Sequence, residues 1–134
     1  MTKPTLLVAA AALVDADGRV LICQRPEGKQ LAGLWEFPGG KVEAGETPEA
    51  CLIRELEEEL AIKVTPACLA PFVFASHEYD AFHLLMPLYL VRRWDGFVER
   101  REHAALAWVK PERFDDYPMP PADGPLCAHL RDFL

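Results

Sequence analysis

Residues 40–62 read GKVEAGETPEACLIRELEEELAI and join a glycine-bounded loop to a strongly acidic segment. Thr47 is a suitable N-cap and Pro48 a suitable first helical residue, so we expect a helix over residues 47–60. Apolar residues recur at helical spacing and would face a core: Leu52, Ile53, Leu56 and Leu60. The stretch therefore predicts an amphipathic helix that follows directly on a tight loop.

The polar face of this helix carries more negative charge than stability alone favours. Glu55, Glu58 and Glu59 share one arc at about 100° per residue. Glu55 and Glu59 form a like-charge i,i+4 pair that costs roughly 0.2–0.5 kcal/mol, and the helix dipole disfavours anions near the C-terminus. A solvated acidic face in which Arg54 pairs with Glu58 is the simpler interpretation. Divalent cations held by the three carboxylates would instead turn the repulsion into attraction.

The loop before the helix favours the metal interpretation. Residues 37–41 read FPGGK, and together with Gly45 they bracket a compact turn in which backbone can approach a ligand closely. Gly40 is followed by five residues and then Glu46. Seven more residues separate Glu46 from the run Arg-Glu-aliphatic-x-Glu-Glu, which begins at Arg54. This pattern resembles the Nudix box of hydrolases that act on nucleoside diphosphates linked to another group. Ala61 stands where that family usually has glycine, and because alanine tolerates left-handed geometry poorly, we expect a shifted helix terminus.

Length and composition indicate one compact domain over residues 1–134, with 51% apolar residues for its core. Within the chain, no apolar run approaches the ~18 residues of a membrane span. The four scattered cysteines are typical of buried residues in a reducing compartment. A net charge of −7 argues against binding to nucleic-acid polymers, and metal ions would have to mediate between this protein and phosphates. We expect a cytoplasmic monomer or weak dimer that binds no membrane.

The remaining chain alternates strand-like and helical segments without a linker or repeat. Strands are expected at 5–14, 19–25, 34–37, 62–75, 82–93 and 105–109, with a helical turn at 111–115 and a last helix at 125–133. The first two strands would form a hairpin at Asp17-Gly18. Strand runs interrupted by helices indicate the α+β class. The resemblance independently implies the Nudix fold, a mixed β-sheet sandwiched between α-helices.

The resemblance extends over the whole chain and is closest to MutT-type nucleoside triphosphate diphosphatases. Segments 24–26, 33–41, 90–96 and 117–125 carry it outside the box. It implies that Mg²⁺, for which Mn²⁺ can substitute, is held by Glu55, Glu58, Glu59, Glu102 and the backbone carbonyl of Gly39. It also implies that Arg54 orients a glutamate. We expect Gly40 and Glu46 to brace the loop, with contact to the metal as the alternative for Glu46. Water would attack the β-phosphorus, releasing a nucleoside monophosphate and pyrophosphate.

A second group of residues is expected to bind the substrate: Arg25, Glu36, Phe37, Lys41, Phe82 and Asp123. Arg25 suits the forked recognition of phosphate oxygens, or it is a surface arginine that closes a strand. Phe37 and Phe82, with Trp35 and Tyr79, can stack on a base, although Trp35 and Phe37 fit a core equally well. The four histidines have no constellation of partners in the sequence and are expected to be structural or exposed.

Asp123 departs from the resemblance, because MutT-type enzymes often carry an asparagine there that recognises oxidised guanine. An ionised aspartate can only accept hydrogen bonds, so it favours an exocyclic amino group over a carbonyl oxygen. A protonated Asp123 could donate, and would restore guanine binding. Alternatively, Asp123 is the N-cap of the last helix.

The function expected first is hydrolysis of oxidised or noncanonical nucleoside triphosphates, such as 8-oxo-dGTP, before a polymerase uses them. The main alternative is a pyrimidine triphosphate diphosphatase acting on CTP, dCTP or 5-substituted dCTP. Hydrolysis of nucleotide sugars or ADP-ribose is a lesser alternative. A noncatalytic base-binding domain is a minor one, because such domains lose the box carboxylates that this chain keeps.

Overall fold

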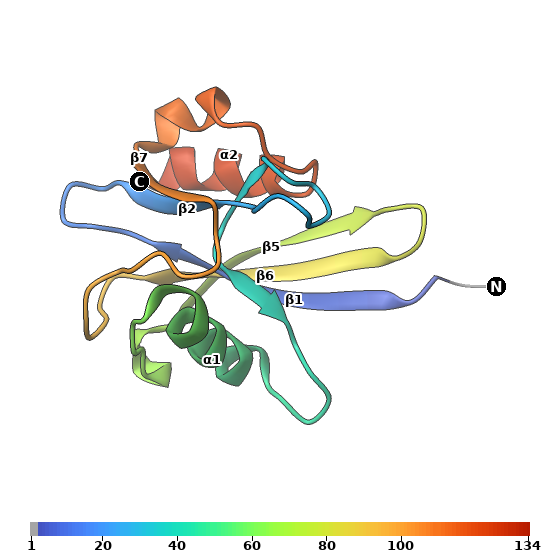
Figure 1. Ribbon diagram of the computed structural model, residues 1–134, viewed down its shortest axis with the longest axis horizontal. Coiled ribbons are helices and arrows are strands. Elements are labelled where there is room, and N and C mark those ends of the chain that lie inside the picture. Colours follow the sequence, from blue (N-terminus) through green and yellow to red (C-terminus); the bar gives the residue numbers. More distant parts are fainter. Residues whose placement is uncertain (1–2) are drawn as a thin grey trace.

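The computed structural model describes residues 3–134, which form two β-sheets and two α-helices (Figure 1). The four-stranded sheet has the order β4-β1-β6-β5 and the three-stranded sheet the order β3-β2-β7. The strands are β1 (Thr5–Leu13), β2 (Val20–Gln24), β3 (Trp35–Glu36), β4 (Gly39–Lys41), β5 (Ala70–Glu78), β6 (His83–Val91) and β7 (Ala105–Val109). The α-helices are α1 (Pro48–Leu60) and α2 (Asp123–Phe133), and the short 3₁₀ helices are η1 (Pro66–Cys68) and η2 (Pro111–Asp116).

Helices α1 and α2 lie on opposite sides of the strands (Figure 1). The centre of the molecule is β1, which runs parallel to β6 and antiparallel to β4. Its alanines are buried on both faces: Ala10 and Ala12 belong to the core cluster beneath α2, and Ala9 and Ala11 to the cluster beneath α1. The predicted α+β class, with a mixed sheet between helices, is confirmed.

Helix α1 begins as predicted. The Thr47 hydroxyl accepts a hydrogen bond from the Ala50 N–H at 3.1 Å, and Pro48 is the first helical residue. The expected shift of its other end is wrong, because the helix ends at Leu60 and Ala61 itself adopts left-handed geometry (φ 61°, ψ 28°). Directly afterwards, the backbones of Lys63 and Asp95 exchange two hydrogen bonds of 3.0 and 2.9 Å. We attribute the unfavourable alanine conformation to this tertiary pairing, which fixes the path of the chain.

Other elements also differ from the sequence-based expectation, and Gly39–Lys41, expected to be part of the glycine-bounded loop, form strand β4. Strands β1 and β2 do not form a hairpin: they share only the Val14–Val20 bridge and then enter different sheets. Of the strand predicted at 62–75, only the part from Ala70 onward belongs to a strand, because residues 66–68 form η1. Helix α2 begins at Asp123, two residues early, and its N-cap is Ala122 without a side-chain hydrogen bond, so Asp123 is not the cap.

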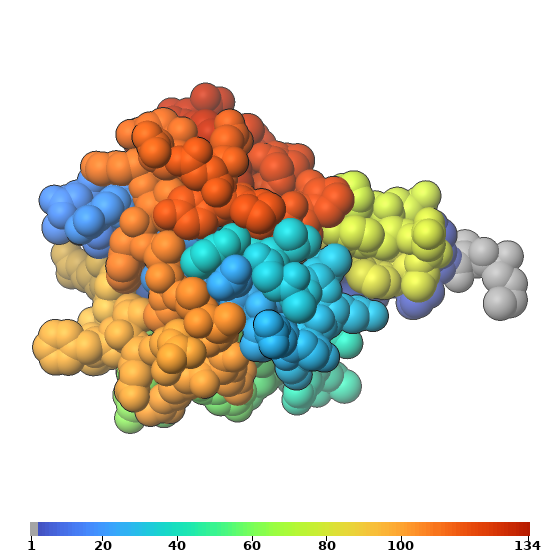
Figure 2. Space-filling view, turned by 45° about the horizontal axis from the view of Figure 1, so that its top comes forward, coloured from blue at the N-terminus to red at the C-terminus, as the bar shows by residue number. Residues whose placement is uncertain are grey.

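The fold leaves two features that matter for the site. The tip of the β5–β6 hairpin projects from one side of the molecule (Figure 2). Strand β4, which lies in the chain before α1, pairs with β1. In the described part of the chain, no helix has the length and apolar character required to cross a membrane.

Candidate active site

The glycine loop lies against both the central strand and α1. In the antiparallel pairing of β4 with β1, Gly39 stands opposite Ala10 and Gly40 opposite Ala9. A Cβ atom at Gly39 would lie 2.0 Å from the Ala9 carbonyl oxygen, and one at Gly40 would lie 2.5 Å from the Glu55 carboxyl carbon. Position 39 therefore requires glycine because the clash is with backbone, whereas a side chain at position 40 would require the Glu55 carboxylate to move.

Arg54 connects the loop to the helix through its whole guanidinium group. Its Nε and Nη2 donate to the two Glu46 oxygens at 2.8 and 2.9 Å, and its Nη1 donates to Glu55 Oε1 at 2.7 Å. These bonds hold the pKa of Glu46 at about 2. The Glu43 N–H donates to Glu46 Oε1 at 3.0 Å, so Glu46 also closes the loop. Glu58, 54% exposed, lies 3.5 Å from Arg54 and is the weaker partner.

The helical spacing places Glu59 on the outer, acidic face of α1, but the structure buries its side chain. Its residue is only 6% exposed, and its Oε2 has no hydrogen-bond partner among residues 3–134. Burial, followed by the charges of Glu55, Glu36 and Glu102, raises the pKa of Glu59 to about 9, while the Gly39 N–H acts in the opposite direction. A buried carboxylate among like charges is stabilised by a bound cation.

The donors fit a hard divalent cation, although they are not arranged around one. Burial raises the pKa of Glu55, and Glu58 and Glu102 add to the effect, which places these carboxylates within electrostatic reach of one another. Nevertheless, no three His, Cys, Asp or Glu side chains within 3–134 form a ready-made metal cluster. The reason is visible in the contacts, because Glu55 is bonded to Arg54 and Glu58 faces solvent. Carboxylate and carbonyl oxygens are the ligands that Mg²⁺ prefers.

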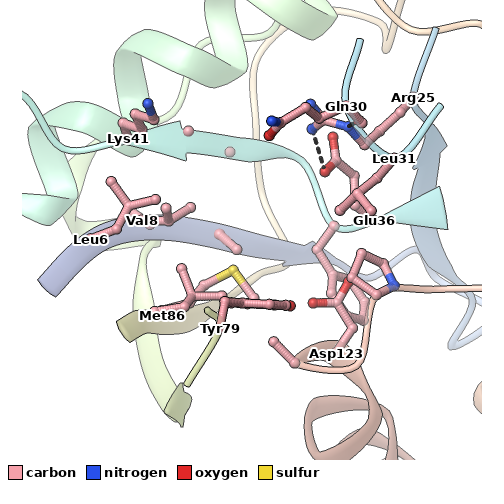
Figure 3. A pocket seen from close by; sticks show the side chains of 18 of the residues that line it. Leu6, Val8, Arg25, Gln30, Leu31, Glu36, Lys41, Tyr79, Met86 and Asp123 are labelled. Carbon is pink, nitrogen blue, oxygen red and sulfur yellow. Dashed lines mark hydrogen bonds and ion pairs between the residues drawn. The ribbon is translucent and has the colours of Figure 1, made fainter. Parts of the chain in front are cut away.

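A cavity of about 600 Å³ extends from the glycine loop to the start of α2 (Figure 3). All six residues expected to bind substrate line it: Arg25, Glu36, Phe37, Lys41, Phe82 and Asp123. Gly39 and Gly40 form part of the same wall, and Tyr79 contributes from the β5–β6 hairpin. Trp35 is not among the lining residues and packs edge-on against Tyr117, with 5.1 Å between ring centroids. Phe37, only 4% exposed, serves both core and cavity.

The charged part of the cavity wall consists of two acidic side chains, Glu36 and Asp123, and two basic ones, Arg25 and Lys41. Arg25 donates from Nη1 to Glu36 Oε1 at 3.0 Å and from Nε to the Gln30 carbonyl at 2.7 Å, so its guanidinium is held beside Glu36 (Figure 3). Asp123 is 4% exposed, and burial together with the Glu36 charge raises its pKa to about 7. The cavity therefore presents two carboxyl groups to a ligand, one of which titrates near neutrality.

The interpretation of the histidines was wrong for His103. Its side chain is 5% exposed, and Nε2 lies 3.5 Å from both Glu36 Oε2 and Glu59 Oε1. The sequence offered one hint, since His103 directly follows Glu102, the acidic residue expected to reach the site from outside the box. Its partners are distant in the sequence, and only the fold brings them together.

The chain resembles known nucleotide hydrolases over nearly its whole length. A model of the NUDIX domain matches residues 9–129. A CTP pyrophosphohydrolase of Escherichia coli is 41% identical over 123 residues, covering 90% of this chain and 88% of the relative. An 8-oxo-dGTP diphosphatase of Haemophilus influenzae is 39% identical over 130 residues, covering 97% and 94%. A MutT structure from work on Aliivibrio salmonicida and Vibrio cholerae aligns with TM-score 0.81 at 34% identity, covering 97% of this chain and 99% of that one.

Proposed function

Because the chain belongs to the Nudix hydrolase family and is a MutT-type nucleotide diphosphatase, we propose that it hydrolyses oxidised or noncanonical nucleoside triphosphates, such as 8-oxo-dGTP, to a monophosphate and pyrophosphate. One observation carries this proposal. A single cavity is lined by Asp123 and Glu36, which suit a base, and by Gly39 and Gly40 beside the acidic helix, which suit a triphosphate. A nucleotide can therefore occupy both ends at once.

Nudix hydrolases generally use divalent cations, and we propose Mg²⁺, with Mn²⁺ as a substitute. The carboxylates of Glu55, Glu58, Glu59 and Glu102 and the carbonyl of Gly39 would hold it. When bound, the cation supplies charge neutralisation for the phosphates and a lowered pKa for the attacking water. The orphaned Oε2 of buried Glu59 supports this role.

Arg54, Arg25 and the glutamates have separate proposed roles. Arg54 binds both Glu46 and Glu55, so that it ties the loop to the helix beside Gly39 and Gly40 of the cavity wall. Glu55, Glu58 and Glu102 are the carboxylates that could accept the proton of the attacking water. Arg25, paired with Glu36, can contact a phosphate only by exchanging or sharing that partner.

A second substrate class, cytosine nucleoside triphosphates, is favoured by the two carboxyl groups in the cavity wall. Glu36 and Asp123 both line it, and an ionised carboxylate accepts but does not donate. The exocyclic amino group of cytosine matches such an acceptor, whereas a guanine carbonyl oxygen does not. CTP, dCTP and 5-substituted dCTP belong to this class.

We further propose a single catalytic domain that acts in the cytoplasm as a monomer or weak dimer and binds no nucleic-acid polymer. Cys23, Cys51, Cys68 and Cys127 carry free thiols, which suits a reducing compartment. The net charge of −7 disfavours a polyanionic partner.

A screen of natural and oxidised triphosphates with Mg²⁺, read by pyrophosphate release and repeated in EDTA, tests the activity. We expect release that depends on the metal and is fastest with a noncanonical or cytosine substrate. In H₂¹⁸O, attack at the β-phosphorus places one label in pyrophosphate, whereas label in the monophosphate indicates attack at the α-phosphorus. Inorganic phosphate as the first product, or binding of nucleotides without turnover, would reject the proposed reaction.

A further inference from the structure

His103 lies where three elements of the fold meet. It belongs to the connection between β6 and β7, while Glu36 ends β3 and Glu59 stands in the last turn of α1. One ring nitrogen, Nε2, lies 3.5 Å from Glu36 Oε2 and 3.5 Å from Glu59 Oε1. A single polar atom therefore stands between a carboxylate of the cavity and a carboxylate of the acidic helix.

Glu36 connects His103 to the wall of the cavity. The second oxygen of Glu36 accepts from Arg25 Nη1 at 3.0 Å, and both residues line the cavity. On the other side, Glu59 Oε2 has no partner within the described residues. The contact with His103 is therefore the side-chain restraint that the structure gives to the Glu59 carboxylate.

Hydrogen bonds of the backbone anchor the chain at His103, and the other ring nitrogen adds no further bond within residues 3–134. Arg100 Nη1 donates to the His103 carbonyl at 3.0 Å, and the next residue, Ala104, donates its N–H to the Gln24 carbonyl at 2.9 Å. Nδ1 is buried and has no hydrogen-bond partner in the described chain. The two nitrogens are thus inequivalent, and only Nε2 faces the carboxylates.

We propose that His103 is a positioning residue that holds the carboxylates of Glu59 and Glu36 through Nε2 and thereby sets the affinity of the acidic helix for divalent cations. The inference rests on the proposed function in so far as Glu59 is a ligand of that cation. A group that orients a ligand from behind typically contributes 10–100-fold to metal affinity.

Three substitutions separate the role of Nε2 from that of the ring as a whole. His103→Gln places an amide nitrogen near the position of Nε2, His103→Asn places one near Nδ1, and His103→Leu keeps bulk without a polar atom. Binding of Mn²⁺ without nucleotide is measured from the electron paramagnetic resonance signal of the free ion. We expect His103→Leu and His103→Asn to weaken binding about 10- to 100-fold, and His103→Gln to restore most of it.

Equal losses in the Gln and Asn variants, or parental Mn²⁺ affinity in His103→Leu, would overturn the proposal. Absence of Mn²⁺ binding by the parent protein would reject the metal-dependent function instead. A double-mutant cycle on thermal stability, measured in EDTA, tests the contact of His103 with Glu36 and Glu59 in the absence of metal. The change in Tm caused by His103→Leu should differ between the parent and the Glu36→Gln/Glu59→Gln protein, and identical changes would also overturn the proposal.

Discussion

The Glu55 carboxylate occupies the space that a side chain at Gly40 would fill. A Cβ atom at position 40 would stand 2.5 Å from Glu55 Cδ and 2.8 Å from each carboxylate oxygen. Arg54 fixes the same carboxylate from the other side at 2.7 Å. The Glu55 carboxylate can therefore keep this position only if residue 40 has no side chain.

Gly40→Ala should displace Glu55 and lower kcat by about 10²-fold, the loss that a misplacement of about 1 Å can cause. Steady-state hydrolysis in saturating metal measures this. Gly124→Ala is the matched control, because nothing lies within 4 Å of a Cβ atom at this helical position. That variant should keep its activity and gain about 0.5–1 kcal/mol of stability. Parental kcat in Gly40→Ala would show that the position of Glu55 does not matter.

Glu58→Gln and Glu59→Gln should each lower kcat by at least ~10²-fold, because each removes a charged oxygen from the proposed metal site. Turnover measured over a range of Mg²⁺ concentrations distinguishes lost affinity from lost chemistry. If either variant keeps near-parental turnover in saturating Mg²⁺, the assignment of that glutamate to the metal is wrong.

Glu58 and Glu59 should contribute differently to the pH dependence of the protein's stability when metal is removed with EDTA. The pKa of Glu59 is raised to about 9 in the folded protein, from an ordinary value of 4.5. The folded state therefore keeps a proton that the unfolded state loses, so stability falls as pH rises between these values. Glu59→Gln should remove this fall and be more stable than the parent at alkaline pH. Glu58→Gln, with its carboxyl 54% exposed in the parent, is the control and should keep the slope. Chemical denaturation at several pH values measures both.

Local signals in the sequence were sufficient to predict the start of the acidic helix, but not that Gly39–Lys41 before it form strand β4. Thr47 caps α1 and Pro48 opens it as expected, because capping depends on residues only three positions apart. The burial of Glu59 could not be predicted in this way. Its helical position indicates an acidic outer arc, but His103 and Glu36 come from distant segments and lie against it.

The left-handed residue at the end of α1 also could not be predicted from the local sequence. Propensity disfavours left-handed alanine, yet Ala61 adopts φ 61° where Lys63 and Asp95 pair directly downstream. The early start of α2 likewise places Asp123 in the wall of the cavity, although a capping role was equally consistent with the sequence. In both cases, tertiary contacts outweigh a local preference of about 1 kcal/mol.

Ala61→Gly should therefore stabilise the protein by about 1 kcal/mol, because glycine adopts left-handed geometry without the penalty that alanine carries. Thermal unfolding measures the gain, and activity should be unchanged. Ala50→Gly is the matched control, since it makes the same chemical change within the same helix, where it should cost about 1 kcal/mol. A loss of stability in Ala61→Gly equal to that in Ala50→Gly would mean that Ala61 carries no strain.

The final prediction concerns Asp123 and the choice of base. Its carboxyl group is 4% exposed, lines the cavity with Glu36, and has a pKa raised to about 7. Below this pH the protonated group can donate to a carbonyl oxygen such as guanine O6, as an amide does. Above it the carboxylate only accepts and repels that oxygen, but it still accepts from a cytosine amino group.

Asp123→Asn should raise kcat/KM for 8-oxo-dGTP relative to dCTP by ~10-fold or more above neutrality, because a mismatched buried polar group is removed. In the parent, the same ratio should fall as pH rises through about 7, the pKa of Asp123, whereas in the variant this fall should be absent. Measuring both substrates at each pH cancels effects of pH on the metal site, which both share. A ratio that neither the substitution nor pH changes would place Asp123 outside the base-binding region and leave the cytosine candidate without its structural support.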